Sequence, residues 1–308
     1  MTYAVETKNL TKQYKTALAV DNIDLAIPAG SCCGFLGKNG AGKTTTIKML
    51  VGLKRPTNGS ISIMGQEQHF GVKTKIPFGY LPDVPNFYGY MTGAEFLDLA
   101  GKLCNIPTQK RKEKVAELLK LVGLEKTRTK ISGYSRGMKQ RLGIAQAMIN
   151  DPPVIFMDEP VSALDPIGRR DVVEIIQSLK NTTVIFSTHI LADVENLCDF
   201  VLIIEKGKIM AQDYMTNLKA AKASGTAKIR FYSQEDASMF LIHANNCSHF
   251  LADKQPDPME ITLRSKTGDM SQLSQDVISL LKTHGLGFEN FGAHTPHLED
   301  IFYEAIGK

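Results

Sequence analysis

One octapeptide constrains this chain more than any other stretch of its sequence: GKNGAGKT, residues 37–44. It fits the pattern G-x-x-x-x-G-K-[ST], and it lies between SCCGFLG, which reads as a strand, and KTTTIKMLVGL, which reads as a helix. Glycine lets the backbone N–H groups of such a loop converge on phosphate oxygens, which a Cβ atom would obstruct. The stretch therefore predicts a phosphate-binding loop in an α/β fold, in preference to an ordinary glycine-rich turn.

The polar residues of this loop have expected tasks toward a nucleotide. Lys43 would place a positive charge against the β- and γ-phosphates, and the Thr44 hydroxyl suits a Mg²⁺ ligand. The N-terminus of the helix that follows also favours an anion. The residues expected to contact the nucleotide here are Gly37, Lys38, Asn39, Gly40, Ala41, Gly42, Lys43, Thr44 and Thr45.

Two carboxylates, Asp158 and Glu159, end the apolar run VIFMDEP. In a fold with a phosphate loop, the carboxyl end of such a buried strand faces the nucleotide. We therefore expect Asp158 to hold Mg²⁺ through water, as a partner to Thr44, and Glu159 to activate the attacking water as a general base. An isolated Asp-Glu pair would more simply begin a solvated turn, but the phosphate loop in the same chain favours the catalytic interpretation.

A second small-residue loop, GYSRGMKQRL, precedes this acidic strand at residues 133–142. Ser135 can cap a helix that begins near Met138, and Gly137 allows close approach of the backbone to an anion. A plain helix N-cap would need no more than this. Together with the two motifs above, however, the stretch resembles the signature loop of the ATP-binding cassette (ABC) family, usually Leu-Ser-Gly-Gly-Gln. Ser135 and Gly137 match that loop, and the other three positions depart from it.

The resemblance assigns further roles in chain order. In the family the signature loop completes the ATP site of the opposite subunit of a head-to-tail dimer, so Ser135 and Gly137 would serve a neighbour's ATP. Tyr14 resembles the aromatic residue that stacks on adenine, and Asp165, in SALD, resembles the key acid of the loop that crosses the dimer interface. His189, which ends TTVIFSTH, resembles the switch histidine that contacts the γ-phosphate.

One position departs from the family in a way that affects the chemistry. Most members carry glutamine after the segment that reads FGYLP here, and that glutamine reaches Mg²⁺ and the attacking water. This chain has Asp83. A carboxylate can also ligate Mg²⁺ or bind water, but it is shorter than glutamine and charged. We expect the Asp83 loop to couple the ATP site to the helical insertion.

Composition excludes few classes of protein. The net charge of +4 is mild, and no clustered basic run favours nucleic acid. The N-terminus has no signal-peptide core, and the longest apolar runs, VIFM and FVLII, are far shorter than the roughly 20 residues that span a bilayer. Five cysteines without paired spacing indicate a reducing compartment. His243, Cys247 and His249 have no fourth ligand nearby, which does not favour a metal site.

The expected fold is a P-loop NTPase of the ABC type, an α/β domain with a mixed sheet core, followed by a small α+β domain. Short apolar runs alternate with helical periodicity as far as about residue 210. We place the nucleotide-binding domain at 1–220, its helical subdomain at about 85–150, and an accessory domain at 221–308. Three local patterns support this: a capping box at Thr92 and Glu95, an Asn-Gly turn opening NGSISIMG, and apolar helical stripes. One stripe comprises Val115, Leu118, Leu119 and Val122, and another comprises Leu273, Val277, Leu280 and Leu281.

The resemblance implies an ATPase that uses ATP and Mg²⁺ and drives export through a separate membrane permease. The acid at position 83, the YSRGMKQR loop and the tail LEDIFYEAI resemble the ATPase subunits of ABC-2 exporters. The expected location is the cytoplasmic face of the cell membrane, and the expected partners are a permease and a second copy of the chain or a related ATPase subunit, not nucleic acid. A cassette acting on ribosomes or DNA, or a regulator without turnover, are the alternatives.

Overall fold

The computed structural model describes residues 2–71, 76–179, 182–223, 225–244, 247–293 and 297–307. It divides into two units, Met1–Met215 and Thr216–Lys308. The boundary expected between residues 220 and 221 falls inside helix α7, Met215–Ala223. The assignment of nucleotide binding to residues 1–220 and of an accessory role to residues 221–308 remains a prediction.

A mostly parallel sheet carries the sequence motifs of the first unit. Its strand order is β11-β10-β4-β9-β8-β7, and only the pairing of β10 with β11 is antiparallel among the described strands. Every residue of β8 and β9 is buried, as is typical of parallel strands that are covered on both faces. The bounds are β4 Cys32–Leu36, β7 Phe78–Leu81, β8 Val154–Asp158, β9 Thr183–Thr188, β10 Phe200–Glu205 and β11 Lys208–Tyr214.

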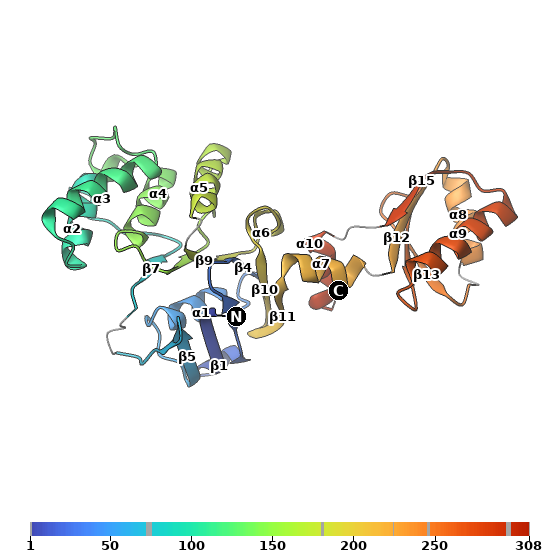
Figure 1. Ribbon diagram of the computed structural model, residues 1–308, viewed down its shortest axis with the longest axis horizontal. Helices are drawn as coiled ribbons and strands as arrows, with labels where there is room; N and C mark the ends of the chain where they lie inside the picture. The colour runs from blue at the N-terminus through green and yellow to red at the C-terminus, as the bar shows by residue number, and fades with distance from the viewer. Residues whose placement is uncertain are drawn as a thin grey trace. The chain divides into compact units, whose positions relative to one another are not determined.

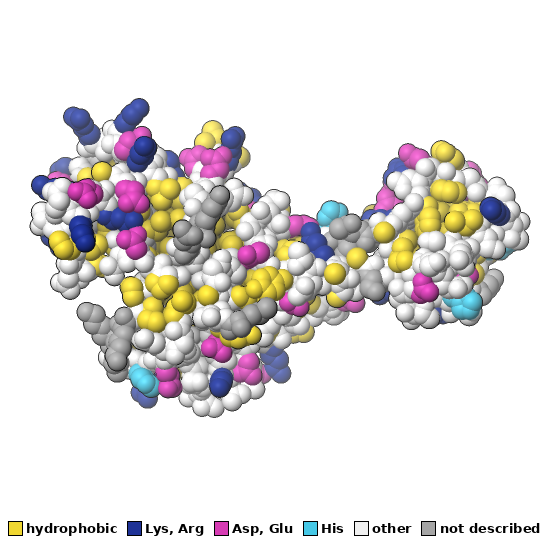
Figure 2. Space-filling model, in the orientation of Figure 1, with side chains coloured by type: hydrophobic (Ala, Val, Ile, Leu, Met, Phe, Trp, Pro, Cys, Tyr) yellow, Lys and Arg dark blue, Asp and Glu magenta, His cyan; other side chains and the backbone are white. Residues whose placement is uncertain are grey.

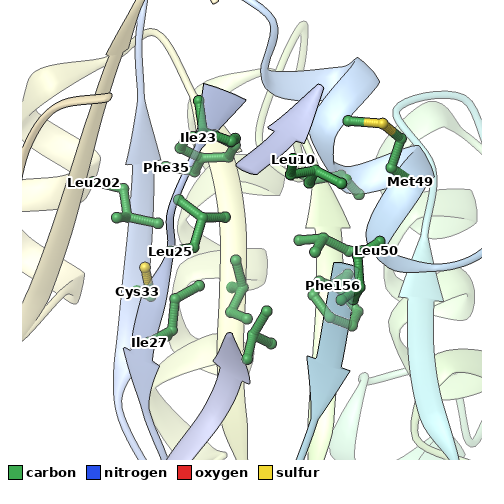
Figure 3. Packing of buried hydrophobic residues seen from close by; sticks show 14 of the residues in the cluster. Leu10, Ile23, Leu25, Ile27, Cys33, Phe35, Met49, Leu50, Phe156 and Leu202 are labelled. Carbon is green, nitrogen blue, oxygen red and sulfur yellow. The ribbon is translucent and has the colours of Figure 1, made fainter. Parts of the chain in front are cut away.

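A second, antiparallel sheet covers one side of this core. Its order is β2-β1-β5-β6, and β3 also pairs with β1. Figure 3 shows Leu10 and Ile23 from this sheet among the buried residues that also include Phe35, Phe156 and Leu202 of the parallel sheet. Each such side chain contributes about 1.5–3 kcal/mol when fully buried, so the two sheets hold one another in place. The bounds are β1 Tyr3–Tyr14, β2 Ala17–Ile23, β3 Ala26–Pro28, β5 Asn58–Ile63 and β6 Gln66–Glu67.

The Asn-Gly pair expected to form a turn lies instead inside β5. Asn58 pairs with Thr11 of β1, beyond a register shift in the ladder between Lys8 and Thr11. Gly59 has φ +92°, and an added Cβ atom would lie 2.5 Å from the carbonyl oxygen of Asn9. Glycine is therefore required here by a bulge next to the neighbouring strand. From the local sequence alone, such a bulge cannot be told apart from a turn.

A helical group fills the segment between β7 and β8 (Figure 1). The capping box that begins its first helix is confirmed: the amide of Glu95 donates to the Thr92 hydroxyl, and the amide of Thr92 donates to the Glu95 carboxylate. The stripe expected on its second helix is buried, so that prediction is also confirmed. In the same orientation, Figure 2 shows acidic and basic side chains interspersed over this group. Its helices are α2 Gly93–Leu103, α3 Thr108–Leu121, the 3₁₀ turn Ile131–Gly133 and α4 Arg136–Ala147.

The other helices of the first unit each follow a strand of the parallel sheet. Helix α1, Lys43–Leu50, begins at the phosphate loop, and its residues Ile47, Met49 and Leu50 belong to the shared core. Helix α5, Pro166–Ser178, follows β8, and helix α6, Leu191–Leu197, follows β9. These two connections place the loops after both strands at one edge of the sheet.

The second unit has the element order β-α-β-β-α-β of a split βαβ fold. Its antiparallel sheet has the order β13-β14-β12-β15, and Ala227 of β12 is paired with Ala293 of β15. The apolar stripe expected on α9 is buried in this unit's own core, which confirms it. The elements are β12 Thr226–Phe231, α8 Gln234–Ala244, β13 Phe250–Lys254, β14 Glu260–Ser265, α9 Met270–His284, β15 Phe288–Ala293 and α10 Leu298–Ala305.

Within the described ranges, no helix combines the length and the apolar character that crossing a membrane requires.

Candidate nucleotide-binding site

The loop between β4 and α1 depends on glycine at two places. Gly42 has φ +114°, and a Cβ atom there would lie 2.7 Å from the carbonyl oxygen of Ala19. A Cβ atom on Gly37 would lie 2.5 Å from the carbonyl oxygen of Ile204. The loop is thus packed so closely against its neighbours that side chains are excluded, which leaves the backbone amides at the start of α1 exposed to a ligand.

Lys43 is folded back onto this loop. Its Nζ atom donates to the carbonyl oxygens of Gly37 at 2.7 Å and Lys38 at 3.2 Å. The same atom forms an ion pair with Oε1 of Glu159 at 3.4 Å, and the Lys43 side chain is only 5 % exposed. A buried cation held by carbonyl oxygens and one carboxylate is poised to meet the charge of a phosphate.

Two hydroxyl groups from different elements converge on Asp158. The Thr44 hydroxyl donates to Oδ1 of Asp158 at 2.9 Å, and the Ser187 hydroxyl donates to the same oxygen at 2.7 Å. The Ser187 oxygen in turn accepts the backbone amide of Glu159 at 3.0 Å. Sequence reasoning missed Ser187, whose only signal was its position at the end of β9, two residues before His189.

Glu159 and His189 face each other across the ends of β8 and β9. The Nδ1 atom of His189 lies 3.0 Å from Oε2 of Glu159. Glu159 has φ +50°, a left-handed backbone conformation that a residue other than glycine adopts at a cost of about 1–3 kcal/mol. This backbone turn aims the carboxylate at Lys43 and His189 at once.

A cavity of about 330 Å³ joins the phosphate loop to the two strand ends. Asp83 belongs to its lining, so the acid in the glutamine position does reach the site. Asp83 also forms an ion pair with Arg136 at the start of α4, with 3.7 Å between Oδ1 and Nη2. The lining residues are Ala19, Lys38, Asn39, Gly40, Gly42, Lys43, Thr44, Thr45, Asp83, Glu159, Ser162 and His189.

Tyr80, on β7, is a second residue that sequence reasoning missed. Its hydroxyl oxygen is buried and has no hydrogen-bond partner in the part of the chain that the structure describes. Burial, and then the negative charges of Asp158 and Asp83, raise the pKa of Tyr80 to about 12. The hydroxyl therefore stays protonated and can act as a donor near both carboxylates.

Tyr14 lies outside this cavity, at the end of β1. Its side chain is 39 % exposed, and the Nζ atoms of Lys12 and Lys54 lie 5.2 and 6.0 Å from its ring centre. The ring is therefore partly accessible for stacking and lies close to two positive charges.

Ser135, Gly137 and Asp165, which are expected to face a neighbouring subunit, are not among the described residues that line the cavity, although Ser162 of the SALD loop is. Ser135 caps α4 by accepting the amide of Met138 at 3.2 Å, so the expected cap is confirmed, although the helix begins earlier, at Arg136. Asp165 caps α5 by accepting the amide of Gly168 at 2.8 Å. A Cβ atom on Gly137 would lie 3.7 Å from the Cα atom of Gly168, so the two helix N-termini are adjacent.

Comparison with known proteins decides the family. The family model described as "ABC transporter" matches residues 20–162. An uncharacterized ABC transporter ATP-binding protein of Bacillus subtilis, YxlF, is 35 % identical over 306 residues, which cover 97 % of this chain and 98 % of the relative. The chain belongs to the ABC transporter ATP-binding proteins. The family that the motifs indicated is therefore confirmed.

Other relatives of this ABC protein have names that include a transported or resisted compound. The bacitracin transport ATP-binding protein BcrA of Enterococcus faecalis is 33 % identical, with 100 % of this chain and 97 % of the relative covered. The daunorubicin/doxorubicin resistance ATP-binding protein DrrA of Streptomyces peucetius is 31 % identical, with 99 % and 93 % covered.

Solved structures confirm the expected ABC ATPase fold. The ATP-binding subunit of an ABC transporter superposes with a TM-score of 0.64 at 30 % identity, covering 71 % of this chain and 93 % of that one. The cassette MJ0796, described as a dimer in a post-hydrolysis state bound to ADP and Pi, has a TM-score of 0.61 at 24 % identity, covering 68 % and 98 %.

Proposed function

We propose that this chain binds and hydrolyses ATP as the motor subunit of an exporter, in a dimer that acts on a separate membrane permease. One observation carries the proposal. The phosphate loop and the Glu159–His189 pair come from distant parts of the sequence and line one cavity, and the Asp158–Ser187 pair is joined to it through the Thr44 hydroxyl. That combination suits transfer of a terminal phosphoryl group to water better than binding alone.

Within the cavity, each charged residue has a distinct task. Lys43 exchanges Glu159 for the β- and γ-phosphates, so binding of ATP releases the Glu159 carboxylate. Glu159 then accepts a proton from the attacking water. His189, 3.0 Å from Glu159, orients that carboxylate and contributes a donor toward the γ-phosphate. When the proposed dimer closes around ATP, bulk water is excluded from these groups, and their electrostatic interactions become stronger.

Mg²⁺ fits the oxygen donors at this site. The Thr44 hydroxyl and the Asp158 carboxylate are already within 2.9 Å of each other, and hard oxygen ligands are those that Mg²⁺ prefers. Thr44 would hold the ion directly and Asp158 through water, with Asp83 as a further candidate. The ion would supply charge neutralisation on the phosphates.

The dimer explains residues that the chain's own cavity leaves unused. Ser135, Gly137 and Asp165 lie at the adjacent starts of α4 and α5, where helix N-termini favour an anion. We infer that they face the ATP of a second subunit, with Tyr14 stacking on the adenine of its own. The dimeric form of MJ0796 supports this arrangement. Because the catalytic positions Lys43, Glu159 and His189 are all filled, we propose a homodimer with two working sites.

A permease is the expected second partner. BcrA and DrrA are named for bacitracin transport and drug resistance, which supports an exporter of the ABC-2 type at the cytoplasmic face of the membrane. A few residues after Asp83 in the sequence, the aromatic side chains of Tyr88 and Tyr90 are 54 % and 69 % exposed, and their ring centres lie 5.8 Å apart. We propose that this exposed pair and α2 receive a short helix of the permease.

Light scattering on a sizing column tests the proposal. The Glu159→Gln variant should have the mass of one chain without nucleotide and of two chains with Mg²⁺ and ATP, and the parent should release phosphate where the variant does not. A mass of one chain under both conditions would exclude the ATP-driven homodimer. Equal phosphate release by parent and variant would exclude Glu159 as the general base.

A further inference from the structure

Two cysteines that lie far apart in the sequence meet where β10 begins beside β4. The backbone amide of Asp199 donates to the carbonyl oxygen of Cys32 at 3.1 Å, and the amide of Cys32 donates to Oδ1 of Asp199 at 2.8 Å. The residue before Asp199 is Cys198, which ends helix α6. The two hydrogen bonds therefore hold Cys198 beside Cys32, and both residues carry free thiols.

The side chains of these two cysteines lie on the same face of β4. Side chains alternate between the two faces of a strand, so Cys32 shares its face with Gly34 and not with Cys33. A Cβ atom on Gly34 would lie 2.9 Å from the Sγ atom of Cys198, which places that sulfur over the same face. The Cys198 thiol also forms a hydrogen bond with Cys32. The two sulfur atoms are therefore neighbours, as a disulfide bond requires.

Cys33 is a third thiol in this region, but it points the other way. It is fully buried and belongs to the core cluster in Figure 3, with Ile27 and Leu202. Burial, and then the neighbouring thiol of Cys32, raise the pKa of Cys33. A buried thiol that keeps its proton reacts slowly. Cys33 is therefore a packing residue and not a partner for Cys32.

Cys32 and Cys198 differ in how easily a small molecule reaches them. Cys32 is half-buried, whereas Cys198 is only 8 % exposed. Burial, and then the hydrogen bond with Cys32, raise the pKa of the Cys198 thiol, so this thiol keeps its proton at neutral pH. An oxidant that arrives from solution therefore reacts first with Cys32.

We propose that Cys32 and Cys198 form a modification site at which hydrogen peroxide generates a disulfide bond. The Cys32 thiolate attacks one peroxide oxygen, the O–O bond breaks, and Cys32 becomes a sulfenic acid while hydroxide leaves and takes up a proton. Cys198 then loses its proton and attacks the Cys32 sulfur, the S–O bond breaks, and water leaves. The two sulfur atoms supply the two electrons that reduce the peroxide to two water molecules. A small dithiol reduces the bond again.

A disulfide bond at this place would stabilise the first unit. It would close a covalent loop that runs from β4 to the end of α6 and contains most of that unit. A cross-link over so long a loop lowers the entropy of the unfolded chain. In a reducing compartment both residues stay thiols, and a disulfide forms only while oxidant is present. The site would therefore protect the nucleotide-binding unit against unfolding during oxidation.

Mass spectrometry of the full chain tests this proposal, before and after treatment with equimolar hydrogen peroxide. The mass should fall by two hydrogen atoms, and peptide mapping with the remaining thiols blocked should place the bond between Cys32 and Cys198. Thermal unfolding should show that oxidation raises Tm by about 5–15 °C. Dithiothreitol should reverse both changes.

Three variants separate the roles of the thiols. Cys198→Ala should stop at the sulfenic acid of Cys32, which dimedone traps. Cys32→Ala should give neither a disulfide nor a dimedone adduct at Cys198, because that thiol is buried. Cys104→Ala is the matched control: it removes an exposed thiol at the end of α2 and should form the bond as the parent does. Thermal unfolding in dithiothreitol should show every variant to be folded.

Three results would overturn the proposal. The first is a parent chain that forms no disulfide bond with peroxide, and the second is a bond between Cys32 and Cys33. The third is a disulfide bond that still forms at Cys32 in Cys198→Ala. An oxidised chain whose Tm equals that of the reduced chain would overturn the stabilising role. Because none of these measurements uses a nucleotide, their outcome is independent of the proposed function.

Discussion

Replacing Glu159 with glutamine should tighten the binding of metal-free ATP while it abolishes most hydrolysis. In the nucleotide-free chain the Lys43 ammonium lies 3.4 Å from the Glu159 carboxylate, and these side chains are 5 % and 14 % exposed. Two unit charges at that distance interact by about 5 kcal/mol at an effective dielectric constant of about 20. An incoming phosphate must displace this partner and is also repelled by it. Glutamine keeps the shape of the side chain and removes both effects.

Only part of that energy will appear in the affinity. Most of this energy is recovered in the parent when Lys43 contacts the phosphate, so we expect about a quarter of it, ~1.2 kcal/mol, to appear as a roughly sevenfold lower Kd. Hydrolysis should fall by about 10²–10⁴, the usual contribution of a general base. Calorimetry in EDTA measures the first quantity, and phosphate release with Mg²⁺ measures the second.

The control for this substitution is Glu174→Gln, which removes an exposed carboxylate that pairs with Arg170 on α5. It should change neither the affinity nor the rate. If Glu159→Gln bound metal-free ATP with unchanged or lower affinity, the Lys43–Glu159 pair would not oppose nucleotide binding, and the reasoning from their distance would be refuted.

Three further predictions concern the loop, the second unit and pH. Gly42→Ala should abolish ATP binding and lower Tm, because its φ of +114° and the Ala19 carbonyl oxygen 2.7 Å from the added Cβ atom force the loop to move; calorimetry and thermal unfolding measure this. Phe240→Ala, at a fully buried site in the second unit, should destabilise that unit by about 3–5 kcal/mol in urea unfolding. Tyr80 has a pKa of about 12, raised by burial, so its contribution to stability is present below the pKa of an unfolded tyrosine, near 10, and is lost as pH rises through about 12. Tyr80→Phe should therefore unfold at a Tm that falls less steeply between pH 9 and about 11 than that of the parent.

The sequence was sufficient to predict those features whose physical cause lies within a single segment of the chain. The phosphate loop needed only its glycines and its place between a strand and a helix, and the Thr92–Glu95 box needed only two residues at the right spacing. The same holds for the buried stripes of α3 and α9, whose period of 3.6 residues is visible in the sequence.

The rest of the site depends on contacts between distant segments. Ser187 joins Asp158 to Glu159 only because β8 and β9 are neighbours in register, with Asp158 opposite Ser187. Nothing in the sequence places Arg136 near Asp83, or leaves the Tyr80 hydroxyl without a partner. Such features follow from the packing of the sheet and the helical group, which local patterns do not encode.

The strand pairing of the second unit has a consequence for how this protein can be altered. Because Ala227 is paired with Ala293, the chain enters and leaves the sheet of this unit at one point. The segment between those residues therefore begins and ends at neighbouring positions. It could be deleted, or exchanged for another domain, by joining helices α7 and α10 through a short linker. Members of one family could in this way carry different accessory domains while the nucleotide-binding domain stays unchanged.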